Sequence, residues 1–295
     1  IYTSKNTLSL HDALPIYYDA TKELGDWTKL DYDASSWENA TEYGIGGEGA
    51  YGNLYHRGIP FLKDYGLKAY ENSKEYENYT VKNLFGEKIT VDIPYNAQLT
   101  PYLKVIAPEG KKIRITTENT PIGAVSTTYI TKEGEQEFEA LGWFNGEHIT
   151  YDIPHGVTVV SLMYRETGYD SSFAGNFKCD DEFLNSLWQK SLRTLYVTMR
   201  DNFMDCPDRE RAQWWGDVTI EMNMTMYSMD SNSYLLYQKG VDAMLSHVDE
   251  SKVLQTVVPI SGDYFELPVQ ELAGIVGFLT YYEYTGDKAF VEKVY

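Results

Sequence analysis

The sequence has few cysteines, few basic residues and no long apolar run. Two cysteines in 295 residues are too few for a disulfide framework, so two free thiols are expected. There are 25 Lys and Arg against 44 Asp and Glu, a net charge of −19. Nucleic acids and anionic membranes need basic patches, so neither is expected as a partner. No apolar run approaches the roughly 20 residues of a membrane span.

Motifs for metal and nucleotide chemistry are also missing. The five histidines form no HExxH pair, and neither cysteine belongs to a CxxC pair, so a zinc site is not expected. Neither a G-x-S-x-G elbow nor a P-loop occurs, which leaves serine-hydrolase and NTPase hypotheses without an anchor. We expect no metal and no cofactor.

Residues 205–217 are the most informative part of the chain. This segment holds four carboxylates, two arginines and two adjacent tryptophans. Aromatic faces beside paired carboxylates are what a site needs to hold a sugar ring and break its glycosidic bond. The alternative is an amphipathic helix with a solvated acidic face and a buried Trp pair. The mixture of charge and tryptophan favours a carbohydrate site.

The local pattern predicts a turn followed by a helix. Pro207 disfavours helical backbone at the residue before it, and Asp208 could cap a helix that starts near Arg209. A helix from there would place Glu210, Trp214, Asp217 and Glu221 on one face. Crowded carboxyls in a cleft are expected to raise the pKa of at least one of them, which suits a general acid.

The same segment resembles a known signature. The run Asp205-Cys206-Pro207-x-Arg209-Glu210-Arg211, with Trp214 and Gly216-Asp217, is similar to that of the α-L-rhamnosidases of glycoside hydrolase family 78. Residues 177–188 resemble the entry to that family's catalytic domain, and residues 281–287 resemble one of its helix connections. The resemblance covers about residues 70–295.

The resemblance implies roles for five residues. Glu210 would be the general acid, Asp205, Arg209 and Asp217 would bind rhamnose hydroxyls, and Trp214 would stack on the sugar. The implied ligand is a rhamnose-containing oligosaccharide, polysaccharide or glycoside.

The family inverts configuration, which requires a second carboxylate about 6.5–9.5 Å from the acid to activate water. In the family this base lies much further along the chain. None of Glu221, Glu266 and Glu271 matches its motif. The resemblance therefore implies that the chain carries only the acid half of an active site and is inactive alone.

One departure keeps other functions open. Gln213 and Trp215 flank the motif Trp, where the family usually has smaller residues. A related six-hairpin glycosidase that acts on another sugar is one alternative, and a non-catalytic carbohydrate-binding protein is another.

Four segments are expected along the chain. Residues 1–16 resemble a non-native, adaptor-like leader, and residues 17–69 a remnant of an accessory β-sandwich. Residues 70–175 alternate short strands with turn signals, such as Asn145-Gly146, and predict an antiparallel β-sandwich. Within them, residues 142–148 are expected to form a hairpin turn with packed aromatics, or else a sugar-contacting loop. Residues 176–295 are expected to be the N-terminal part of an (α/α)6 catalytic domain.

Helical periodicity begins after Gly175. The pattern predicts helices from about residue 183 to 199, after the motif to about 227, from 233 to 248, and from 269 to 284. Asp180 is expected to cap the first, and Gly286 to end the last. So few helices cannot close a barrel, so exposed apolar surface and a tendency to aggregate are expected.

Overall fold

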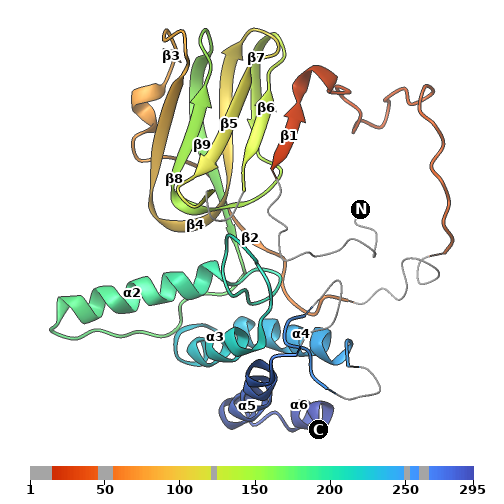
Figure 1. Ribbon diagram of the computed structural model, residues 1–295, viewed down its shortest axis with the longest axis vertical. Coiled ribbons are helices and arrows are strands. Elements are labelled where there is room, and N and C mark those ends of the chain that lie inside the picture. The colour runs from red at the N-terminus through yellow and green to blue at the C-terminus, as the bar shows by residue number, and fades with distance from the viewer. Residues whose placement is uncertain (1–14, 46–55, 121–124, 249–252, 259–265) are drawn as a thin grey trace.

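The computed structural model describes residues 15–45, 56–120, 125–248, 253–258 and 266–295. It consists of a β-sheet packed on a group of helices that follow it in the chain (Figure 1). The strands are β1 (Ile16–Asp19), β2 (Lys63–Ala69), β3 (Tyr79–Thr80), β4 (Glu87–Ala107), β5 (Lys112–Thr117), β6 (Thr127–Ile130), β7 (Gly134–Glu139), β8 (Phe144–Ile153) and β9 (Thr158–Gly168). The helices are α2 (Glu182–Val197), α3 (Trp215–Ser228), α4 (Asn232–Leu245), α5 (Pro268–Thr285) and α6 (Lys288–Val294), and two short 3-10 turns cover Ala20–Lys22 and Ser73–Tyr76.

The strands in the described residues form one curled sheet in the order β1-β6-β5-β8-β4-β9-β2, with β3 on β9 and β7 on β4. The long strand β4 lies between β8 and β9 in this order. It pairs with β8 through Glu87–Leu99 and with β9 through Leu99–Ile106. Alternate residues of these strands point into a single apolar core. The expected sandwich is therefore one hydrogen-bonded sheet that curls around its core. Most pairs are antiparallel, whereas β1 and β6 are parallel.

Two strands come from the first 69 residues. β1 pairs with β6 and β2 pairs with β9, so both belong to the same sheet as the later strands. Ile16, the last residue of the predicted leader, begins β1. The rest of that leader, residues 1–14, lies outside the described residues.

The helices follow the predicted order, with corrections at their ends. α2 begins at Glu182, close to the predicted start, but its cap is Asp181 and not the predicted Asp180. The Asp181 carboxylate accepts hydrogen bonds from the backbone N–H of Phe183 at 2.8 Å and of Leu184 at 3.4 Å. α5 ends at Gly286, whose φ of 65° is the left-handed conformation that glycine adopts at helix ends.

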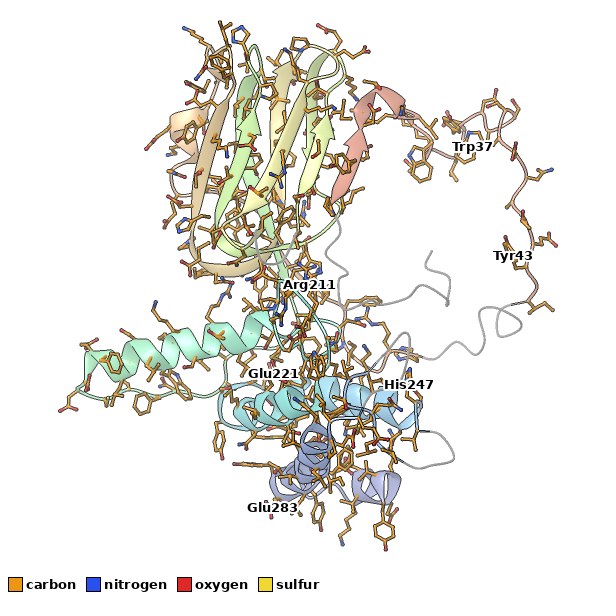
Figure 2. The ribbon with its side chains drawn as sticks, viewed as in Figure 1. Trp37, Tyr43, Arg211, Glu221, His247 and Glu283 are labelled. Carbon is orange, nitrogen blue, oxygen red and sulfur yellow. The ribbon has the colours of Figure 1, made fainter. Side chains whose placement is uncertain are left out.

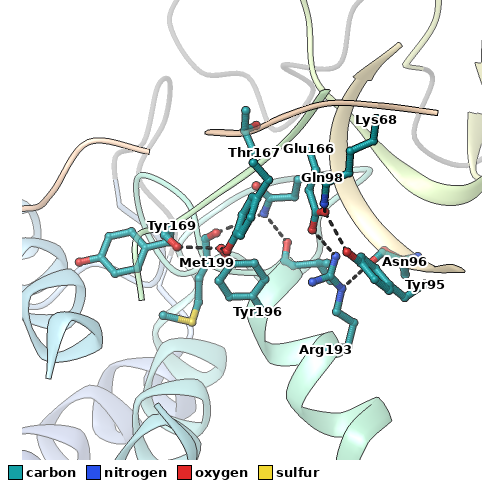
Figure 3. A network of polar contacts seen from close by, with 12 residues as sticks. Lys68, Tyr95, Asn96, Gln98, Glu166, Thr167, Tyr169, Arg193, Tyr196 and Met199 are labelled. Carbon is teal, nitrogen blue, oxygen red and sulfur yellow. Dashed lines mark hydrogen bonds and ion pairs between the residues drawn. The ribbon is translucent and has the colours of Figure 1, made fainter. Parts of the chain in front are cut away.

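A polar network joins the sheet to α2 (Figure 3). Glu166 of β9 accepts hydrogen bonds from Arg193 at 2.8 Å and from Lys68 at 2.7 Å. Burial alone would raise the pKa of Glu166, but the hydrogen bonds from Arg193 and Lys68 lower it. Gln98 Nε2 of β4 donates a hydrogen bond to the carbonyl oxygen of Val197 at 2.7 Å. The C-terminal half of α2 is therefore fixed to the sheet.

The helices share a second core that includes Trp215, Tyr237 and Phe278. Apolar side chains also face solvent along α2, α3 and α5, among them Phe183, Leu187, Ile220, Leu272, Ile275 and Leu279. In the described part of the chain, no helix is long and apolar enough to cross a membrane.

Candidate active site

The motif forms a turn that leads into α3, and it is not helical throughout. Residues 207–210 make the turn, and the helix begins at Trp215. Arg211 has a φ of 52°, a left-handed conformation that a continuous helix does not allow. The predicted helix start near Arg209 is therefore wrong, and Glu210 precedes α3.

Contacts with Pro207 and Trp143 hold Arg211 in this conformation. Its Nε donates to the carbonyl oxygen of Pro207 at 2.9 Å, and its Nη2 donates to that of Trp143 at 3.0 Å. The guanidinium also stacks on the Trp143 ring, with its carbon 3.4 Å from the ring centre. Arg211 lies where the sheet meets the helices (Figure 2).

Glu210 is held by three neighbours. Trp214 Nε1 donates to Glu210 Oε2 at 2.8 Å, and Arg209 forms an ion pair with Oε1. The Glu210 backbone N–H donates to Cys206 Sγ at 3.3 Å. Both carboxylate oxygens and the backbone are therefore oriented by residues of the same motif.

Asp205 closes the base of this turn. Its backbone N–H donates to the carbonyl oxygen of Ala212, and its Oδ1 accepts from the Ala212 N–H, each at 3.0 Å. Burial raises the pKa of Asp205, and the nearby charge of Glu210 raises it further.

Asp217 and Glu221 lie one helical turn apart on α3. Burial raises the pKa of Asp217, and the Glu210 charge adds to this. Burial also raises the pKa of Glu221 well above its usual value, and the charges of Asp217 and Asp205 contribute. The raised pKa values of these three carboxyls are therefore caused mainly by burial, and neighbouring charges add to them.

Asp208 does not cap a helix, which corrects the sequence prediction. Its Oδ2 accepts a hydrogen bond from Asn145 Nδ2 of β8 at 3.2 Å. Asn145 and Gly146 lie within β8, so the turn predicted there is also wrong. Asp208 instead links the motif to the sheet.

Two cavities adjoin the motif. The smaller, about 440 Å³, is lined by Asp205, Asp217 and Glu221 together with polar and apolar residues of α2 and α3, among them Lys190 and Ile220. The larger, about 1010 Å³, lies between the sheet and the helices and reaches Asp205 and Asp208. Asp205 is the one predicted site residue that lines both cavities.

The two residues that depart from the family pattern point away from these cavities. Gln213 is buried, and its Nε2 donates to the carbonyl oxygen of Gly240 at 3.4 Å. Trp215 is buried in the helical core, where its ring lies 6.3 Å from that of Tyr237 in an edge-on arrangement. They therefore contribute to packing, and the case for a different sugar loses its basis in these residues.

Cys206 and Asn145, which hold the motif, were not predicted as site residues. Both cysteines are free, as expected, and the thiol of Cys206 supports Glu210. Trp143 and Asn145 both lie in residues 142–148, for which the sequence predicted a hairpin turn. Within the described ranges, no group of three or more His, Cys, Asp or Glu side chains could hold a metal ion.

Comparisons with known proteins identify the helical part. Residues 172–295 match the family model of the bacterial alpha-L-rhamnosidase 6 hairpin glycosidase domain. An alpha-L-rhamnosidase of Formosa agariphila is 28% identical over 253 residues, which are 76% of this chain and 24% of that protein. The chain thus spans about a quarter of the length of this curated relative. The resemblance predicted from the motif is confirmed for this part of the chain.

Solved structures show the same fold. The alpha-L-rhamnosidase from Dictyoglumus thermophilum matches with a TM-score of 0.76 and 23% identity, over 94% of this chain and 32% of that chain. The alfa-L-rhamnosidase from Aspergillus terreus matches with a TM-score of 0.75 and 20% identity, over 94% of this chain and 33% of that chain. The Streptomyces avermitilis alpha-L-rhamnosidase complexed with L-rhamnose matches with a TM-score of 0.76 and 18% identity, over 94% of this chain and 27% of that chain. At these identities the likeness concerns the fold, a curled sheet followed by helices.

Proposed function

We propose that this chain is part of an α-L-rhamnosidase that removes terminal α-L-rhamnosyl residues from glycosides or polysaccharides with inversion of configuration. The observation that carries the proposal is the oriented carboxylate of Glu210. It is held by Trp214 and Arg209, and its charge raises the pKa of both Asp205 and Asp217. The family match over residues 172–295 supports the same reaction.

In this proposal Glu210 is the general acid that protonates the leaving oxygen. Asp205 and Asp217, which line the 440 Å³ cavity, accept hydrogen bonds from sugar hydroxyls. Arg209 donates to a hydroxyl, and Trp214 offers an aromatic face for the apolar side of the sugar. Arg209 pairs with Glu210 here, so a bound sugar would have to draw the guanidinium away from the carboxylate in order to accept a hydrogen bond from it.

An inverting reaction also needs a base opposite the acid. We assign this base to a part of the whole protein that this chain does not contain. Glu221 is a poor candidate, because burial favours its neutral form. Glu271 is engaged locally, since its Oε1 accepts from the backbone N–H of Leu267 at 3.2 Å.

We further propose that α2 to α6 are the first helices of an (α/α)6 barrel, preceded by the sheet as a separate domain. The apolar residues exposed on α2, α3 and α5 support this, because further helices of a barrel would cover them. Residues 17–69 remain assigned to a remnant of an accessory domain, although β1 and β2 pair with the main sheet.

The test uses the complete protein that carries this chain and a panel of aryl glycosides. We expect turnover of the α-L-rhamnoside and, for an aryl rhamnoside with a poor leaving group, a loss of about 10²–10⁴-fold in Glu210→Gln, the range typical of a missing general acid. The exposed Glu182, at the start of α2, provides a matched control in Glu182→Gln. Proton NMR of the first product should show inverted configuration.

Equal activity of Glu210→Gln and wild type on the substrate with the poor leaving group would rule out the acid assignment. Preference for another aryl glycoside would favour a related six-hairpin glycosidase. Full function after replacement of Asp205, Glu210 and Asp217 would instead indicate a non-catalytic carbohydrate-binding protein.

A further inference from the structure

Strand β4 carries a bulge that faces the larger cavity. Asp92 pairs with His148 of β8 and Ala97 pairs with Gly146, so residues 93–96 of β4 lie opposite the single residue Glu147. Bulges of this kind redirect side chains out of a sheet and are common beside functional sites. Here the bulge directs Tyr95 and Asn96 to the cavity wall.

The bulge is held firmly from behind, as Figure 3 shows. Tyr95 donates its hydroxyl hydrogen to Glu166 Oε2 at 3.0 Å, and the Arg193 guanidinium carbon lies 4.1 Å from the Tyr95 ring centre. Arg193 Nε also donates to the backbone carbonyl oxygen of Asn96. Tyr95 as a whole residue is still 38% exposed. The wall is therefore organised before any ligand binds, which lowers the entropic cost of binding.

Two side-chain acceptors on this wall have no donor. Among the described residues, neither Asn96 Oδ1 nor Asn145 Oδ1 has a hydrogen-bond partner, and both atoms are buried. Asn145 is only 3% exposed, and its Nδ2 is already used by Asp208, which fixes the direction of its oxygen. A buried acceptor without a donor costs about 1–3 kcal/mol, so a ligand that donates to it would gain correspondingly.

The chemistry of the wall indicates the class of ligand. Amide oxygens accept from hydroxyl groups, and an exposed tyrosine ring packs against the apolar face of a sugar. Glu166 is paired with Arg193 and with Lys68, so the charges behind this wall are already engaged with one another. A neutral sugar fits this combination, and the volume of about 1010 Å³ is at the upper end of small-molecule sites.

We propose that Tyr95, Asn96 and Asn145 form a subsite for a neutral sugar on the leaving-group side of the scissile bond. This inference rests on the proposed function. If the smaller cavity holds the rhamnosyl residue between Asp205 and Asp217, the larger cavity, which Asp205 also lines, receives the rest of the substrate. The sheet thereby takes part in substrate selection.

The test compares two substrates in the complete protein: an aryl α-L-rhamnoside, and disaccharides in which rhamnose is linked to a neutral hexose. Asn96→Leu removes the acceptor at nearly constant size. We expect kcat/KM for the disaccharides to fall about five- to tenfold, and that for the aryl substrate to stay within about twofold. Asn96→Asp keeps acceptor oxygens and should retain most disaccharide activity.

Asn83→Leu is the control, because Asn83 lies between β3 and β4, where its Oδ1 accepts a hydrogen bond from the Phe85 N–H at 3.0 Å. Strand β3 lies at the end of the sheet away from the helices (Figure 1). This variant should leave kcat/KM unchanged for both substrates. Unchanged aryl activity in Asn96→Leu also shows that the variant is folded. Equal loss on both substrates, or no loss on either, would overturn the subsite and leave the proposed function intact. No turnover of any rhamnoside by the wild type would overturn both.

Discussion

At the residue scale, the candidate acid depends on side chains that do no chemistry themselves. The indole of Trp214, the guanidinium of Arg209 and the thiol of Cys206 each contact Glu210. Arg211, in its left-handed conformation, separates these contacts from α3. The spacing of residues in the motif thus reflects the geometry of a turn, and the tryptophan that follows the turn orients the candidate acid.

Glu221 is the residue whose titration should be visible in stability. Its pKa is raised in the folded state because of burial, and its Oε2 has no hydrogen-bond partner in the described chain. A raised carboxyl pKa means that the folded state binds the proton more tightly than the unfolded state. Stability is therefore greatest below the unfolded pKa and falls as pH rises through the folded pKa.

Glu221→Gln removes this titration. We expect the variant to be more stable than wild type at pH 8, by about 1 kcal/mol, and the gain to disappear near pH 4. Thermal unfolding of the complete protein across this range measures the effect. A gain of equal size at both ends of the range would mean that Glu221 does not titrate as described.

At the element scale, the start of α2 provides a test of the local geometry. Asp181, not Asp180, accepts the first free N–H groups of the helix. Asp181→Ala should cost about 1 kcal/mol, the usual value of an N-cap, whereas Asp180→Ala should cost little because Asp180 is exposed and makes no cap. Denaturant unfolding of the two variants decides the matter, and a larger cost for Asp180→Ala would contradict the assignment.

The sequence predicted elements better than their ends. Periodicity located the strands and helices because alternation and helical spacing follow directly from which faces are buried. It failed at residues 205–214, because the left-handed backbone of Arg211 is stabilised by Trp143, more than sixty residues away. It failed at Asn145-Gly146 for a similar reason: a common turn pair lies in a strand because β4 pairs with it, Gln98 with Asn145 and Ala97 with Gly146. Long-range contacts decided both cases.

At the scale of the whole molecule, one side of the helical group lacks a covering layer. The first half of α2 extends beyond the other helices (Figure 1), and Phe183 is 72% exposed there. Similar apolar side chains face solvent on α3 and α5. Contiguous exposed apolar surface of this kind normally marks an interface, here the proposed contact with further barrel helices.

This arrangement predicts the behaviour of residues 1–295 made alone. We expect aggregation at micromolar concentration, or a soluble form without a cooperative thermal transition, because the helical core is open to water on one side. The complete protein under the same conditions is the control. A soluble monomer of residues 1–295 with one sharp transition would contradict the expectation.

The most direct test of the central claim is the dependence of rate on the leaving group. Aryl α-L-rhamnosides of graded phenol pKa should show a shallow dependence of kcat/KM in the wild type, because Glu210 protonates the departing oxygen. In Glu210→Gln the dependence should become steep, with good leaving groups nearly unaffected and poor ones slowed by several powers of ten. If kcat/KM depended equally on the phenol pKa in the two proteins, Glu210 would not be the acid.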